Sequence, residues 1–192
     1  MMAEQQRDVI EVLEHDHREV EEMFSELEAL RGASSEEDLK RRKELAEDVT
    51  IELVRHSVAE EVIVYPQVED TVDAEEVEHA REEHAEAEET LQRLEKLDAD
   101  SPHFDDELAT LMKEIRHHIE DEEGEMFAHM RETIDPDDLR KLGARVEAFK
   151  KVAPTRPHPN VPNEALPRLA AGPMASLLDR LRDAATGRGS SS

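Results

Sequence analysis

Apolar residues recur every three or four positions in four long stretches of the chain, with polar residues between them. This period places the apolar side chains on one face of an α-helix, so each stretch predicts an amphipathic helix. A histidine interrupts each apolar series, and in two series a glutamate follows it. The series are Ile10, Leu13, His17, Val20, Phe24, Leu27; Val49, Leu53, His56, Glu60, Ile63; Val77, Ala80, His84, Ala87, Leu91, Leu94; and Leu108, Leu111, Ile115, His118, Glu122, Met126.

Glycine, proline and capping residues mark the expected ends of these helices. Serine or aspartate before an acidic first turn favours a helix start, proline fits the first turn, and glycine favours a stop. The predicted helices run from about Glu4 to Leu30, from Ser34 or Ser35 to Tyr65-Pro66, from an Asp73/Glu76 capping pair to about residues 98–100, and from Ser101-Pro102 to the end of the fourth series.

A fifth, shorter helix is predicted after Asp135-Pro136, and we expect it to pack across the others through an apolar series of its own. The fold class is therefore all-α: an up-down-up-down four-helix bundle with a short fifth helix and a proline-rich C-terminal tail. The fifth series is Leu139, Leu142, Val146, Phe149. The expected divisions are the bundle over 1–133, the accessory helix over 134–153, and the tail over 154–192, with a short amphipathic helix over Met174–Ala185.

Charge and composition exclude several classes of protein. The formal net charge is −26, which disfavours nucleic acid and anionic membrane surfaces as partners. The chain has no cysteine, so neither a disulfide nor a thiolate metal site can form. No stretch approaches the roughly 20 apolar residues that span a bilayer, and we expect a cytoplasmic protein. A protein partner for the tail is left open.

The interrupting histidines and glutamates occupy positions that should be buried. Burying four imidazoles and two carboxylates in a small core is unfavourable unless something pairs them. Two helices share a pattern, His-x-x-x-Glu-Glu with an aromatic residue nine positions after the histidine, which predicts two helical hairpins related by pseudo-twofold symmetry. The repeated residues are His56, Glu60, Glu61, Tyr65 and His118, Glu122, Glu123, Phe127.

These side chains form a plausible donor set for two metal ions. Residues four apart share a helix face, so each glutamate can bind beside its histidine or bridge two ions. Four imidazoles and two carboxylates without sulfur suit iron or manganese, and they suit zinc less well. We place Glu61 and Glu123 outside the ligand set, and we expect Tyr65 to pack at a helix end. The remaining histidines, expected at the surface, are His15, His79, His103, His117, His129 and His158.

A ferritin-like di-iron site, which needs Glu-x-x-His, is the nearest rival chemistry. The chain contains this spacing at Glu14/His17, Glu76/His79 and Glu114/His117. Two of these histidines lie off the apolar series, and such matches arise by chance in a glutamate-rich chain. We therefore reject a ferritin-like di-iron site for this chain.

The chain resembles the hemerythrin-like (HHE cation-binding) family over about residues 8–130. The resemblance implies a four-helix bundle with two non-haem irons bridged by carboxylates and an oxo or hydroxo group. It rests on Asp16-His17-Arg18-Glu19-Val20, on His56-x-x-x-Glu60-Glu61 with Tyr65-Pro66, on Glu83-His84, and on His118-x-x-x-Glu122-Glu123. The metal ligands it implies are His17, His56, Glu60, His84, His118 and Glu122.

The chain departs from the oxygen-carrying hemerythrins, which have a His-x-x-x-His pair on the third helix. Here Ala80 and Glu88 stand four residues either side of His84, so the resemblance is to the four-histidine, two-glutamate branch. This branch suggests a protein that handles peroxide, dioxygen or nitric oxide, for example by a catalase-like reaction. The alternatives are a binding or sensing protein for dioxygen, nitric oxide or iron without turnover, and a metal-free structural bundle. Whether the chain is an enzyme is left open.

Overall fold

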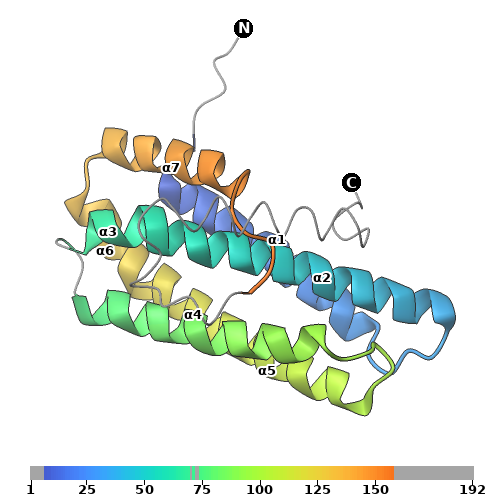
Figure 1. Cartoon of the computed structure of the whole chain (residues 1–192). Helices are drawn as coiled ribbons and strands as arrows, with labels where there is room; N and C mark the ends of the chain where they lie inside the picture. The colour runs from blue at the N-terminus through green and yellow to red at the C-terminus, as the bar shows by residue number, and fades with distance from the viewer. Residues whose placement is uncertain (1–6, 70, 72–73, 158–192) are drawn as a thin grey trace, which may run out of the picture.

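The computed structural model describes residues 7–69, 71 and 74–157. Within these residues four long helical columns lie alongside one another, and a shorter helix covers one side (Figure 1). The chain runs alternately up and down these columns, which confirms the predicted all-α bundle. The helices are α1 (Val9–Ala29), α2 (Glu36–Ala59), η1 (Glu60–Val64), α3 (Tyr65–Val68), α4 (Ala74–Glu95), α5 (Pro102–Asp121), η2 (Glu122–Met126), α6 (Phe127–Thr133) and α7 (Pro136–Lys150).

The start of the first helix was predicted too early. Helix α1 begins at Val9, not near Glu4, because Asp8 closes its N-terminus. The Asp8 carboxylate accepts a hydrogen bond from the Glu11 amide, and the Glu11 carboxylate accepts one from the Asp8 amide. This reciprocal pair satisfies two amides that lack partners inside the helix, so Arg7 and Asp8 remain outside it.

The other caps follow the predicted chemistry. Ser35, rather than Ser34, caps α2, while Ser101 caps α5 and Asp135 caps α7 as expected. The proposed Asp73 cap lies outside the described residues. Helix α4 ends at Glu95, before the predicted residues 98–100, and the Lys43 ammonium donates to the carbonyls of Glu95 and Leu97 there.

Wider turns, the π-helical segments η1 and η2, interrupt two of the columns. In η1 the Tyr65 amide donates to the Glu60 carbonyl, and in η2 the Phe127 amide donates to the Glu122 carbonyl. Each such turn adds one residue, which rotates everything after it by about 100° around the helix axis. The second column therefore continues past Tyr65-Pro66 to Val68, contrary to the prediction. Pro66 lies in the first turn of α3, where its missing amide is tolerated.

The apolar core is divided into two clusters. One, near α3, α6 and α7, includes Ile10, Leu13, Val77 and Phe127, and the other includes Val20, Phe24, Leu91 and Leu111. Each series histidine falls between residues of the two clusters along its own helix, as His17 does between Leu13 and Val20. The polar layer in the middle of the bundle is thus closed off from water on both sides by hydrocarbon.

Helix α7 packs along α1 (Figure 1). Leu139, Leu142 and Val146 are buried as predicted, and Phe149 is partly buried against the same cluster. Within the described residues no helix has the length and apolar character to cross a membrane. The tail from residue 158 onward, including the predicted Met174–Ala185 helix, lies outside the described residues.

Candidate metal centre

All six predicted site residues meet in the polar layer between the apolar clusters. His17 comes from α1, His56 and Glu60 from α2 and η1, His84 from α4, and His118 and Glu122 from α5 and η2. None is more than 5% exposed, and Glu60 is completely buried. The structure therefore brings together every side chain of the predicted set.

The imidazole Nε2 atoms and one oxygen of each glutamate face one another. The Nε2 atoms of His17 and His56 are 3.3 Å apart, and those of His84 and His118 are 3.2 Å apart. Glu60 Oε2 lies 3.1 Å from His56 Nε2 and 3.3 Å from His84 Nε2. Donor atoms that share one cation at bonds of about 2.1 Å are separated by about 3–3.5 Å.

The second glutamate repeats this arrangement in the other half of the bundle. Glu122 Oε2 lies 3.5 Å from His17 Nε2 and 3.4 Å from His118 Nε2. Each carboxylate thus stands between one histidine of each close pair, which is the pseudo-twofold symmetry that the sequence repeat predicted. This is the position from which a carboxylate can bridge two ions.

A carboxylate also contacts the outer Nδ1 atom of each histidine. These contacts favour the tautomer with a proton on Nδ1, which leaves the Nε2 lone pair directed into the site. Metal-binding histidines commonly have such partners because they fix the ring and increase its basicity. The contacts are His17 with Glu123 at 2.9 Å, His56 with Asp16 at 3.3 Å, His84 with Glu61 at 3.0 Å, and His118 with Glu83 at 2.9 Å.

The inner carboxylates lack the hydrogen bonds that buried anions need. Both oxygens of Glu60 and Oε2 of Glu122 are buried without a hydrogen-bond donor. His56, Glu60, His118 and Glu122 also offer ligand atoms that all lie within 4.8 Å of one another. Buried carboxylates without donors are strongly unfavourable unless a cation compensates them, so these residues fit a metal pair.

The pKa shifts describe how the site balances its charge without metal. Burial lowers the pKa of His56, but the nearby charge of Glu60, together with the hydrogen bond and charge of Asp16, outweighs burial and raises it to about 10. His84 reaches about 10 for the same reason, through Glu60 and Glu61. Burial raises the pKa of Glu60, yet His56 and His84 hold it well below its ordinary value. Without metal, the protonated imidazoles thus supply the positive charge that compensates the inner carboxylates, as a bound metal cation would.

Tyr65 takes part in the site in a way that the sequence did not predict. It is fully buried, as expected for packing, but its hydroxyl donates to Glu122 Oε1 at 3.1 Å, and its ring stacks on that of His84 with 5.8 Å between centroids. In a regular helix a residue nine positions after His56 points to the opposite side, about 180° away, and the extra residue of the wide turn η1 reduces that offset to about 80°. The aromatic residue that recurs nine positions after His56 and His118 was the sequence signal for this contact. Its second copy, Phe127, stacks in the same way on His17, with ring centroids 6.0 Å apart.

The histidines outside the apolar series lie at the surface where they can be described. His79, His103, His117 and His129 are exposed, as predicted, His15 is half-buried outside the inner set, and His158 lies outside the described residues. Glu61 and Glu123, which were placed outside the ligand set, contact the outer nitrogens of His84 and His17. Asp16 and Glu83 play the same part, which the sequence analysis did not assign to them.

Comparison with known proteins identifies the family. The model of the hemerythrin HHE cation binding domain matches residues 8–130. The chain belongs to this family. The match covers the four columns that carry the site, and the family is one that binds metal ions.

Individual relatives agree with this assignment. An uncharacterized hemerythrin-like protein of Schizosaccharomyces pombe is 33% identical over 135 residues, which make up 69% of this chain and 66% of that protein. A DNA nickase of Nostoc sp. is 23% identical over 146 residues, 76% of this chain but 40% of that protein. The chain thus spans less than two thirds of the length of either curated relative.

A solved structure shares the fold. It is the crystal structure of a hemerythrin HHE cation binding domain-containing protein from Mycobacterium kansasii, with a TM-score of 0.63 and 24% identity. The likeness covers 76% of this chain and 88% of the other.

Proposed function

We propose that this hemerythrin-family protein binds two iron ions between the six inner side chains and reacts with a small oxidant such as peroxide, dioxygen or nitric oxide. The observation that carries the proposal is the set of buried carboxylate oxygens without donors, surrounded by four inward Nε2 atoms. Bound iron would supply electron transfer between its ferrous and ferric states, which no side chain of the site can supply.

The inner residues would bind the two ions in different ways. His17, His56, His84 and His118 would bind through Nε2, and Glu60 and Glu122 would bridge. Six protein ligands do not fill the coordination positions of two iron ions, so room is left for a small molecule. The outer carboxylates would keep the rings oriented, and the two apolar clusters would keep bulk water away from the reaction.

Tyr65 would hold a proton at the edge of this site. Burial and the nearby Glu122 and Glu60 charges raise its pKa well above the ordinary value, so the phenol stays protonated at neutral pH. Its hydroxyl can therefore keep donating to Glu122 Oε1 and fix the orientation of that carboxylate.

A chain with a net charge of −26 is poorly suited to DNA, so the activity of the Nostoc relative is not part of this proposal.

Metal analysis tests the proposal. After anaerobic loading with ferrous iron and removal of unbound metal, we expect about two irons per chain. A content below about one per chain would overturn the proposal in favour of a metal-free bundle. In the loaded protein, continuous oxygen evolution from peroxide would support turnover, whereas a stable and reversible dioxygen or nitric oxide adduct would support binding or sensing.

Substitution of a ligand gives the matching test. His56→Ala should lower iron content and thermal stability together, because metal-binding energy is also folding energy. His15→Ala, which changes a half-buried histidine of α1 outside the inner set, is the control and should leave both unchanged. An unchanged iron content in His56→Ala would remove His56 from the ligand set.

A further inference from the structure

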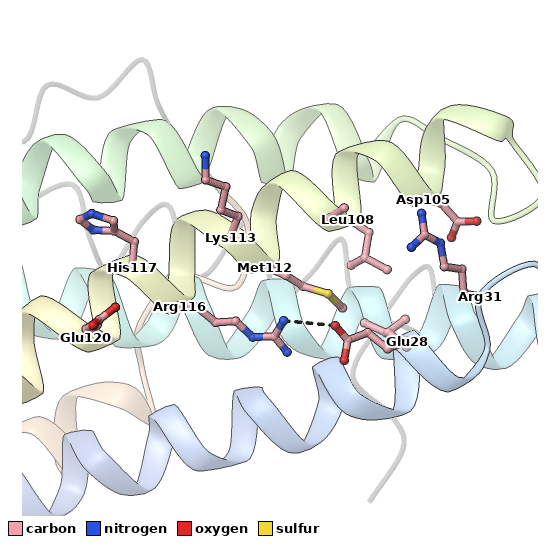
Figure 2. A pocket seen from close by; sticks show the side chains of 11 residues that line it. Glu28, Arg31, Asp105, Leu108, Met112, Lys113, Arg116, His117 and Glu120 are labelled. Atoms are coloured by element: carbon pink, nitrogen blue, oxygen red, sulfur yellow. Dashed lines mark hydrogen bonds and ion pairs between the residues drawn. The ribbon is translucent and has the colours of Figure 1, made fainter.

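A second group of histidines and carboxylates lies at the surface between α4 and α5. His79 and Glu83 are one turn apart on α4, and His117 and Asp121 are one turn apart on α5. None of these four residues belongs to the inner set. Figure 2 shows His117 leaving α5 on the side that faces α4, whereas Arg116 extends toward Glu28 of α1.

The four side chains converge on a small volume. His79 Nε2 lies 3.7 Å from both Glu83 Oε1 and Asp121 Oδ2. His117 Nδ1 lies 2.9 Å from Glu83 Oε1 and 3.3 Å from Asp121 Oδ2. The ligand atoms of His79, Glu83 and Asp121 all lie within 4.8 Å of one another, and His117 contacts both carboxylates, so the group suits one cation.

The carboxylate at the centre of the group is held in place. Glu83 is only 14% exposed, and its other oxygen, Oε2, accepts a hydrogen bond from His118 Nδ1 at 2.9 Å. The ring of His79 meets that of His117 edge-on, with 6.5 Å between centroids. A cation would therefore find Glu83 Oε1 already directed toward both histidines, which reduces the ordering needed on binding.

The surroundings also favour a cation. A groove of about 610 Å³ adjoins the group, and the acidic side chains of Glu82, Glu86 and Glu114 line it. Apart from the two histidines, Lys113 is the one basic residue of its lining. A groove with this excess of negative charge raises the local concentration of cations.

We propose that His79, Glu83, His117 and Asp121 form a surface site for one divalent first-row transition ion of the zinc and ferrous iron class. Two imidazoles and two carboxylates match these ions better than magnesium or calcium, which prefer oxygen ligands alone. The exposed side of the group leaves the ion open to solvent and to exchange.

The site is joined to the inner centre through Glu83. A cation on Oε1 withdraws electron density from the carboxylate and weakens the hydrogen bond that Oε2 accepts from His118. Cation binding at the surface site therefore weakens the hydrogen bond of His118, one of the inner histidines, without a change in fold.

Zinc binding by the full-length, iron-loaded protein tests the site. Calorimetric titration with zinc chloride should detect about one zinc per chain beyond the iron. His117→Ala and His79→Ala should each weaken this binding by at least about tenfold. His129→Ala is the matched control, since His129 is an exposed histidine with Glu76 at 3.4 Å but belongs to no such group, and should leave zinc affinity unchanged.

X-ray absorption at the zinc edge should show two imidazole nitrogens together with carboxylate oxygens around the ion. If the wild-type protein binds no more zinc than the His79→Ala/His117→Ala double variant, the proposed surface site is wrong. Equal competition from magnesium would overturn it as well. Iron content is measured in the same samples and should be unchanged in the surface variants. A failure of the inner centre is thereby distinguished from a failure of the surface site.

Discussion

At the scale of single residues, the inner histidines depend on their outer carboxylates as much as on their place in the bundle. Each imidazole has one nitrogen that faces the site and one that contacts an acidic side chain. Asp16 is itself held by Lys150 of α7, with Nζ 2.7 Å from Oδ1. A change in one outer carboxylate should therefore weaken metal binding without removing a ligand.

Glu123→Gln tests this dependence. The neutral amide no longer stabilises the ring through charge, so iron affinity should fall by about 10–100-fold while the fold is retained. Competition with a chelator of known affinity measures the change. Glu125→Gln, an exposed change in the same turn, is the control, and equal affinity in both variants would contradict the role given to Glu123.

Tyr65→Phe tests the hydrogen bond of Tyr65 to Glu122, which has no counterpart at Phe127 in the other half of the site. The loss of the hydroxyl leaves Glu122 Oε1 buried without its donor, which should lower the free energy of unfolding by about 1–3 kcal/mol. Chemical denaturation followed by circular dichroism suits the measurement, since Tyr65 is the only tyrosine and the chain has no tryptophan. Wild-type stability in the variant would show that the bond contributes nothing net.

At the scale of elements, the wide turns and α7 adapt a simple bundle to the site. The turns η1 and η2 begin at Glu60 and Glu122, so the same local distortion follows both inner glutamates. They direct Tyr65 and Phe127 onto the rings of His84 and His17. Helix α7 then packs against α1 and brings Lys150 to Asp16.

The close contact of α7 with α1 requires glycine at position 143. A Cβ atom there would lie 2.6 Å from the Arg7 carbonyl oxygen and 2.9 Å from the Val9 amide nitrogen, both of them backbone atoms. Gly143→Ala should therefore lower the free energy of unfolding by about 1–3 kcal/mol, as measured by thermal or chemical denaturation.

Gly124→Ala is the matched control for that variant. A Cβ at position 124 would meet no atom within 4 Å, so this change should be neutral or stabilising by up to about 1 kcal/mol. Equal effects of the two substitutions would show that the contact between α7 and the start of α1 does not need glycine.

At the scale of the whole molecule, negative charge opposes the compact state while apolar packing favours it. The chain has a net charge of −26, and most acidic side chains of the described residues are exposed or half-buried. Cross-helix ion pairs, such as those of Arg116 with Glu21 and Glu28, offset part of the repulsion. Exposed pairs of this kind contribute little each, so repulsion should dominate the response to salt.

Raising the sodium chloride concentration from about 20 mM to about 500 mM should therefore raise the Tm by roughly 2–5 °C, because salt screens like charges. Differential scanning calorimetry at fixed pH and fixed iron content measures the shift. A lower Tm at high salt would mean that the attractive ion pairs outweigh the repulsion.

Much of the fold and of the inner site could be predicted from the sequence because both depend on local spacing. The i, i+4 relation of His56 to Glu60 and of His118 to Glu122 fixes each pair on one face before any packing occurs. The caps at Ser101 and Asp135 are also local. The early start assigned to α1 was an avoidable error, since Asp8 and Glu11 have capping-box spacing in the sequence.

The hydrogen bond of Tyr65 could not be predicted in this way. It depends on a wide turn that changes the helical period, and on the approach of Glu122 in η2 to Tyr65 from the other half of the chain. The surface group of His79, Glu83, His117 and Asp121 is similar, since each pair lies on its own helix and only the packing of α4 against α5 unites them.

The sequence by itself determined the helical class, the number of long columns and the six inner side chains, because a repeating apolar face and one-turn spacings constrain a helix independently of its neighbours. Only the tertiary structure decided which acidic residue supports each histidine, where the helical period changes, and which surface side chains converge. Those relations join residues from different helices, and they exist only once the helices have packed.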